Sequence, residues 1–156
     1  MPAIIKKIKS AAHNRTTYKV GLLQAKAYRL LKAHTARGLS DHGASTIEWA
    51  FLGLLYDMKE GVRSSVLARE LGVEAPFISN LSASLQFKGM VESVMDENDS
   101  RGRIVRLTQE GIVFVEKVEQ EMQAHMRPLL KDISICDLVS YISVLETLVI
   151  NIQKYE

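Results

Sequence analysis

The sequence predicts a mainly α-helical fold that carries one small β-hairpin. Apolar residues recur at helical spacing along most of the chain, and a short helix, a tight turn and a second helix follow one another near its middle. The hairpin is indicated by two short apolar-polar segments between residues 91 and 107. With 156 residues, 47% of them hydrophobic, the chain has the size of one domain with a dimerisation extension and can bury a core.

Two helices are expected before residue 61. The first covers residues 16–37, where apolar side chains recur at helical spacing: Val20, Leu23, Ala27, Leu30 and Leu31. Two glycines and an aspartate make residues 38–45 a loop. Ser45 and Glu48 have the spacing of a capping box, which opens the second helix, and Gly61 ends that unit.

The next two helices have the order of a helix-turn-helix. The first, residues 65–71, is closed by Gly72, and the second, residues 75–88, has Pro76 in its first turn. Five apolar positions would lock the two together: Leu67, Leu71, Ile78, Leu81 and Leu85. Many short helix pairs show such spacing, so this motif alone is weak evidence for DNA binding.

The face of the second helix that lies opposite its apolar positions is the candidate DNA-reading face. It holds Pro76, Ser79, Asn80, Ala83 and Phe87. An asparagine can bind adenine through two hydrogen bonds, and an alanine can contact the methyl group of thymine. Residues in the N-terminal half of this helix would approach the base edges.

A β-hairpin directly after these helices strengthens the DNA-binding hypothesis. Its strands are expected at 91–95 and 104–107, with the polar run 96–103 as a long loop. Arg101 and Arg103 near the tip suit a narrow minor groove, where the negative potential is enhanced. Alternatively, they pair locally with Asp96, Glu97 or Asp99, since residues 91–107 carry four acidic and three basic groups.

The chain is expected to end in two amphipathic helices. In the first, after Thr108, the stripe comprises Val115, Val118, Met122, Met126 and Leu129, and Pro128 ends or bends the helix. In the second, the stripe comprises Leu138, Ile142, Leu145, Val149 and Ile152. Such an apolar terminal helix must bury its stripe, and a second copy of the chain is a natural partner.

At this point the sequence resembles the multiple-antibiotic-resistance regulator (MarR) family of winged helix-turn-helix proteins. The resemblance is carried by LARELGV (67–73), ISNLSASLQFKGMV (78–91) and DENDSRGRIVRLTQEG (96–111). The positions of the family's wing pattern are filled by Asp96, Asp99, Arg101, Val105, Leu107, Thr108 and Gly111. Those of its recognition-helix frame are filled by Ser79, Leu81, Leu85 and Gly89.

The resemblance implies a homodimeric transcriptional regulator, usually a repressor, that binds a pseudo-palindromic operator in double-stranded DNA. Residues 1–40 and 112–156 would form the dimerisation region, and 45–111 the winged region, in which Asp99 holds Arg101 for contact with DNA. The candidate DNA-binding residues are then Arg63, Pro76, Ser79, Asn80, Ala83, Ser84, Lys88, Asp99, Arg101 and Arg103. A small aromatic ligand is also implied. Its candidate contacts, chosen only by the helices on which they lie, are Tyr28, His34, Trp49 and Tyr56; ordinary core packing is the alternative for these four.

The recognition helix departs from the family pattern in its charge. Relatives often have a basic residue at the positions of Asn80 and Ser84, and another at that of Ser100, whereas here Lys88 is the one charged residue of the helix. Because phosphate neutralisation supplies most DNA affinity, binding would be weaker, or helped by Arg63, Arg69 and the basic first helix. The alternative function is a winged-helix protein–protein interaction module that has lost DNA binding.

Charge is distributed unevenly along the chain, although its net value is only +2. Residues 1–40 contain nine Lys or Arg and no acid, while residues 108–156 contain eight acids and four bases. This asymmetry indicates either a nucleic-acid patch or two chain ends that pack together, and the amphipathic character of both ends favours the second interpretation.

Other classes of function find little support in the sequence. A single cysteine, Cys136, excludes an intrachain disulfide framework and is interpreted as structural, and the histidines lack metal-ligand spacing. No catalytic motif is present, so no enzyme activity and no cofactor are expected. The longest uninterrupted apolar stretches fall short of a bilayer span, and no secretory signal is found, so we expect a cytoplasmic protein without a membrane segment.

Overall fold

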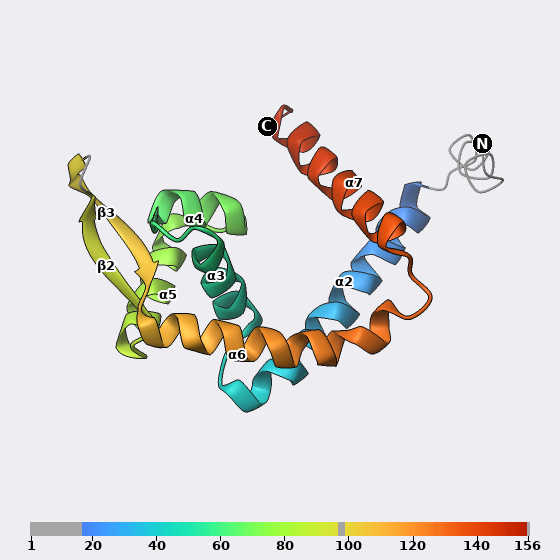
Figure 1. Cartoon of the computed structure of the whole chain (residues 1–156). Helices are drawn as coiled ribbons and strands as arrows, with labels where there is room; N and C mark the ends of the chain where they lie inside the picture. Colours follow the sequence, from blue (N-terminus) through green and yellow to red (C-terminus); the bar gives the residue numbers. More distant parts are fainter. Residues whose placement is uncertain (1–16, 97–98, 156) are drawn as a thin grey trace. The chain divides into compact units, whose positions relative to one another are not determined.

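The computed structural model describes residues 17–96 and 99–155; for residues 17 and 99–102 it describes the backbone alone. The chain is mainly helical with one small sheet (Figure 1). The elements are α2 (Thr17–Leu39), η1 (Ser40–His42), α3 (Thr46–Asp57), β1 (Val62–Arg63), α4 (Ser64–Leu71), α5 (Ala75–Phe87), β2 (Val91–Asp96), β3 (Asp99–Leu107), α6 (Gln109–Met126), η2 (Arg127–Leu130) and α7 (Ile135–Gln153). The predicted helix order and the β-hairpin are thereby confirmed.

The chain divides after Met122 into two compact units. The first contains the helices from α2 to α5, the sheet and most of α6. The second contains the end of α6, η2 and α7.

The core of the first unit lies where α3, α4, α5, the sheet and α6 meet. Leu67, Ile78 and Leu85, three of the positions predicted to lock the helix pair, are almost completely buried, and Leu81 is 9% exposed. The same cluster includes Phe51 from α3, Val105 from β3 and Val115 from α6, among others. The helix-turn-helix is therefore held from both sides, which fixes the direction in which α5 presents its outer face.

The connections between these helices follow the predicted local chemistry. The Ser45 hydroxyl accepts a hydrogen bond from the Glu48 N–H at 3.3 Å, and the Glu48 carboxylate accepts one from the Ser45 N–H at 2.8 Å, so the capping box is present. Gly72 ends α4 with a φ of 63°, in the left-handed region that glycine adopts without strain.

The sheet differs from the sequence-based expectation in two ways. A short strand, β1, was not predicted; it pairs antiparallel with β3, which gives the sheet order β1-β3-β2. The long loop predicted over residues 96–103 is wrong, because β3 already begins at Asp99 and an irregularity follows Met95. The hairpin projects away from the helices (Figure 1). Backbone hydrogen bonds between β2 and β3 therefore continue through the polar residues, which need no buried face to form strands.

The junction between sheet and α6 explains two positions of the wing pattern. The Thr108 hydroxyl donates to the Gly89 carbonyl oxygen at 2.6 Å and accepts from the Gly111 N–H at 3.0 Å, so it caps α6 and ties it to the turn after α5. A Cβ atom on Gly111 would overlap the Met90 carbonyl oxygen. Residue 111 must therefore be glycine for α6 to pack this closely.

The second unit ends in an apolar helix with no buried residue. Ser134 caps α7 by accepting from the Asp137 N–H at 3.1 Å, and apolar residues along the helix, such as Ile142 and Val149, are about half exposed. With 19 residues and a mean hydropathy of 1.7, α7 is long and apolar enough to cross a membrane by length and composition. Asp137 and Glu146 interrupt the apolar residues of α7, so its uninterrupted apolar runs are shorter than the helix itself.

Candidate nucleic-acid interface

The outer face of α5 consists of small and polar side chains directed at solvent. Pro76, Ser79, Asn80, Ala83 and Ser84 are all exposed, as expected for the face opposite the buried positions. The Ser79 hydroxyl donates to the Ala75 carbonyl oxygen at 3.2 Å. No interaction of the Asn80 side chain is found within the part of the chain that the structure describes, so its amide is available to hydrogen-bond a base edge.

Two phenylalanines on α5 are also exposed. Phe77, in the first turn, is 45% exposed, and Phe87, the last residue of the helix, is 95% exposed. Sequence reasoning placed Phe87 on the outer face but overlooked Phe77. Its position three residues before Asn80 was the available signal, since residues three apart are neighbours on a helix surface.

Lys88, expected to contact DNA, is engaged within the protein. Its Nζ atom lies 2.7 Å from Glu48 Oε1, and it also donates to the Gly43 carbonyl oxygen at 3.4 Å. Burial alone would raise the pKa of Glu48, but the hydrogen bonds from Lys88 and Ser45 outweigh it and hold that pKa below its ordinary value. The end of α5 is thus fastened to the start of α3.

Two acidic side chains in the described part of the wing, Asp96 and Glu92, are matched by arginines. Arg63 Nη2 lies 2.7 Å from Asp96 Oδ2, and Arg106 Nε lies 2.7 Å from Glu92 Oε1. Asp96 is only 12% exposed, so Arg63 acts first as the partner of a largely covered carboxylate. The unpredicted strand β1 is what brings Arg63 to this position.

Arg103 is the wing cation best placed for an external anion among the described side chains. Its guanidinium donates to the Ser93 hydroxyl and to the Ser93 carbonyl oxygen, both at 3.0 Å, and it makes no ion pair in the described part of the wing. These bonds aim an exposed guanidinium without neutralising it. The side chains of Asp99 and Arg101 lie outside the described residues, so their expected pairing stays a prediction.

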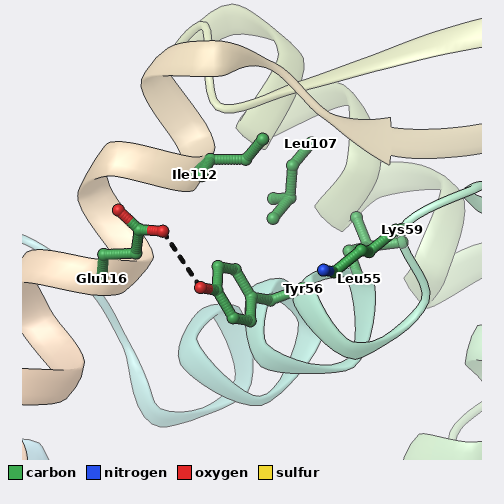
Figure 2. A pocket seen from close by; sticks show the side chains of 6 residues that line it. All are labelled: Leu55, Tyr56, Lys59, Leu107, Ile112 and Glu116. Atoms are coloured by element: carbon green, nitrogen blue, oxygen red, sulfur yellow. Dashed lines mark hydrogen bonds between the residues drawn. The ribbon is translucent and has the colours of Figure 1, made fainter.

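One cavity lies between the end of α3, the base of β3 and α6. It has a volume of about 260 Å³ and is lined by Leu55, Tyr56, Lys59, Leu107, Ile112 and Glu116. Figure 2 shows the Tyr56 hydroxyl directed at the Glu116 carboxylate, to which it donates at 3.0 Å. This hydrogen bond raises the pKa of Tyr56.

A second cavity lies between α2, α3 and α4 and has a volume of about 430 Å³. Tyr28 lines it, with Lys32 Nζ at 5.9 Å from the centroid of the Tyr28 ring, while Thr46 and Ile47 contribute from α3. The structure therefore places Tyr28 and Tyr56 at different cavities. Trp49 packs against the core, and His34 Nδ1 lies 3.2 Å from Arg37 Nη2, so neither lines either cavity.

The remaining candidates for chemistry are sparse in the described ranges. Cys136 lies at the start of α7 and is exposed, rather than buried as a packing residue would be. No group of three or more His, Cys, Asp or Glu side chains in residues 17–96 and 99–155 could hold a metal ion.

The chain is similar in sequence to a known transcriptional regulator. It matches no family model. It is 29% identical, over 123 residues that cover 77% of this chain and 70% of the relative, to the transcriptional activatory protein BadR of Rhodopseudomonas palustris. This relative is a transcriptional regulator, and the helix-turn-helix and β-hairpin of the present chain follow one another in the order of a winged helix-turn-helix.

Comparison with solved structures shows which fold the chain has. AbsC of Streptomyces coelicolor, a MarR-family regulator, superposes with a TM-score of 0.79 at 22% identity over 90% of this chain and 97% of that one. CouR of Rhodococcus jostii bound to p-coumaroyl-CoA gives 0.79 at 18% identity, over 86% and 94% of the two chains. The MepR–DNA complex of S. aureus gives 0.71 at 21% identity, over 84% and 96%. The chain has the MarR-family fold, which confirms the resemblance seen in the sequence.

Proposed function

We propose that this protein regulates transcription by binding a specific sequence in double-stranded DNA as a homodimer. The observation that carries the proposal is the outer face of α5, where Asn80 and its exposed neighbours project from a buried helix-turn-helix frame beside a wing that carries Arg103. A rigid helix of this kind can enter the major groove while the wing contacts the adjacent backbone. MepR, a protein of the same fold, has been solved with DNA.

The proposed contacts divide into those that read bases and those that bind the backbone. Ser79, Asn80 and Ala83 face the bases, whereas Arg101 and Arg103 contact phosphates or the minor groove, with Asp99 orienting Arg101. Pro76 and Ser84 line the same face of α5 and contribute shape. The ion pairs of Arg63 and Lys88 assign them a supporting role: they hold the wing and α5 in position for the other contacts.

The homodimer is proposed from the apolar surface that a single chain leaves uncovered. In α2, Leu23 and Leu30 are more than half exposed, and α7 has no buried residue. Exposed apolar surface on this scale marks an interaction site. We assign residues 1–40 and 112–156 to dimerisation and 45–111 to DNA binding, and we place the dimer in the cytoplasm, with α7 covered by the partner rather than by lipid.

A small ligand is proposed to control DNA binding. CouR, of the same fold, has been solved with p-coumaroyl-CoA. In this chain the cavity beside Tyr28 lies between α2 and the start of α3, and Glu48, the partner of Lys88, is also at the start of α3. The cavity beside Tyr56 is a second, smaller candidate site. We favour ligand-released repression; because BadR is named an activatory protein, a promoter–reporter assay with the chain present and absent decides the sign.

Selection from a random duplex pool tests DNA binding directly. The full-length protein should enrich a pseudo-palindrome whose half-sites are about one helical turn apart, since each subunit of a dimer would present one α5. Asn80→Ala should relax base preference at one position in each half-site. Absence of any enriched motif would refute sequence-specific binding.

The second candidate function is a protein–protein interaction module. It is favoured by the absence of any charged residue between Ala75 and Phe87 and by the 95% exposure of Phe87. The same selection distinguishes the two, because a module that has lost DNA binding would retain no sequence above the level of the starting pool.

A further inference from the structure

We infer that Phe77 is a specificity-determining residue that recognises the methyl group of a thymine in the operator. The inference rests on the proposed function, because it concerns the same face of α5. Phe77 is 45% exposed in the first turn of the helix, although the nearby Ile78 and Leu81 are buried in the core. A large apolar ring is thus held at the end of α5 that comes nearest to base edges.

The composition of α5 restricts how it can distinguish bases. Between Ala75 and Phe87 the helix contains no Lys, Arg, Asp or Glu. It therefore lacks the arginine and lysine side chains that commonly bind guanine, and the acids that accept from cytosine. What remains are the hydroxyls of Ser79 and Ser84, which do not distinguish between bases, the amide of Asn80, which suits adenine, and apolar surface. For apolar surface, the thymine methyl is the matching group in the major groove.

The geometry places Phe77 beside the proposed polar reader. Phe77, Asn80 and Ser84 are separated by three and four residues, so they form one strip along the helix. An adenine bound by Asn80 pairs with a thymine, and neighbouring A·T pairs would bring further methyl groups along this strip. Phe77 would then select thymine at a step adjacent to the one read by Asn80.

Phe87 provides a matched control on the same helix. It is the same residue type and even more exposed, but it lies ten residues further along, about 15 Å by the rise of an α-helix. That distance puts it beyond the N-terminal half of α5, where bases are read. Apolar exposure alone therefore does not define the reader; position does.

The experiment replaces each thymine of the selected operator by deoxyuridine, which removes only the methyl group. Binding of the full-length protein to each duplex is measured at one salt concentration. Losing one buried methyl group should weaken binding about four-fold per half-site. We expect at least one symmetric pair of positions to show this loss with the natural protein and with Phe87→Ala; a pair contacted by Ala83 instead would keep its response in Phe77→Ala.

Phe77→Ala should bind the thymine operator more weakly and lose the response to deoxyuridine at that pair, while Phe77→Leu retains part of it. Equal helix content by circular dichroism shows that the variants are folded. If Phe77→Ala keeps the full deoxyuridine response, or if no position responds in the natural protein, the assignment of Phe77 is wrong although DNA binding stands. If the natural protein selects no sequence at all, the proposed function fails, and this inference with it.

Discussion

Replacing Lys88 by methionine tests whether this residue supports the fold or contacts DNA. Met keeps most of the side-chain length and removes the charge that lies 2.7 Å from Glu48 Oε1. The Glu48 side chain is 12% exposed and that of Lys88 is 40% exposed, so the pair is neither a surface pair nor a fully buried one. Its loss leaves a largely covered carboxylate with the Ser45 hydrogen bonds alone.

The expected magnitude lies between two known limits. Exposed ion pairs contribute about 0.2–1 kcal/mol, and removing one partner of a fully buried pair costs about 3–5 kcal/mol. For the partly covered Lys88–Glu48 pair we expect Lys88→Met to lower the free energy of unfolding by about 1–2 kcal/mol. In a chain of this size that corresponds to a fall in Tm of roughly 3–6 °C.

Thermal unfolding at a fixed protein concentration measures this loss, with a double variant as the control. Because Glu48→Gln removes the uncompensated charge, Glu48→Gln/Lys88→Met should be less destabilised than the sum of the two single variants. The dependence of DNA affinity on salt should keep its slope in Lys88→Met. A slope reduced by about 0.9, with an unchanged Tm, would show that Lys88 binds a phosphate and would refute this reasoning.

The pH dependence of stability gives a second check on the same pair. The pKa of Glu48 in the folded protein lies below its ordinary value of 4.5, so the folded state favours the ionised carboxylate. Its contribution is therefore complete above pH 4.5 and is lost as the pH falls through the lower, folded pKa. In Lys88→Met that pKa should rise, and the loss of stability on acidification should become smaller.

Three further predictions concern the wing, the α6 junction and the dimer. Arg103→Ala should weaken binding to all DNA sequences and reduce the salt slope by about 0.9, since its guanidinium is aimed by Ser93 and has no ion pair in the described part of the wing; an unchanged slope removes it from the phosphate contacts. Gly111→Ala should lower the free energy of unfolding by about 1–3 kcal/mol in urea denaturation, because its Cβ atom would overlap the Met90 carbonyl, and a stability equal to that of the natural protein would contradict the close packing. Val149→Glu, which places a charge on the exposed apolar surface of α7, should yield monomers in sedimentation at micromolar concentration; a variant that stays dimeric would move the interface away from this surface.

Elements governed by local periodicity and capping could be predicted from the sequence. The buried positions Leu67, Ile78 and Leu85 follow from helical spacing, and the start of α3 follows from the Ser45–Glu48 capping box. Because these positions also decide which face of α5 is outermost, the exposure of Ser79 and Asn80 was predictable too. Helical periodicity and capping therefore suffice to predict which residues form the outer face of α5.

Features that depend on partners distant in the chain could not be predicted in this way. The strand β1 has only two residues, too few to show a period, and it exists because β3 pairs with it. The ion pair of Lys88 was not predicted, since its partner Glu48 is 40 residues away and nothing local indicates their contact. The sequence suggested that Asp96 pairs locally with Arg101 or Arg103, whereas the structure pairs it with Arg63, 33 residues earlier in the chain.

Sequence-specific DNA binding is measured by the affinity of the full-length protein for its selected duplex and for a scrambled duplex of the same composition, across a salt series. We expect the protein to bind the selected duplex about 10³-fold more tightly or better, with both affinities falling as salt rises. Asn80→Ala should narrow the difference in affinity between the two duplexes, whereas Arg103→Ala should weaken binding to both alike. Equal affinity for the two duplexes, or no salt-dependent binding to either, would contradict a sequence-specific DNA-binding regulator.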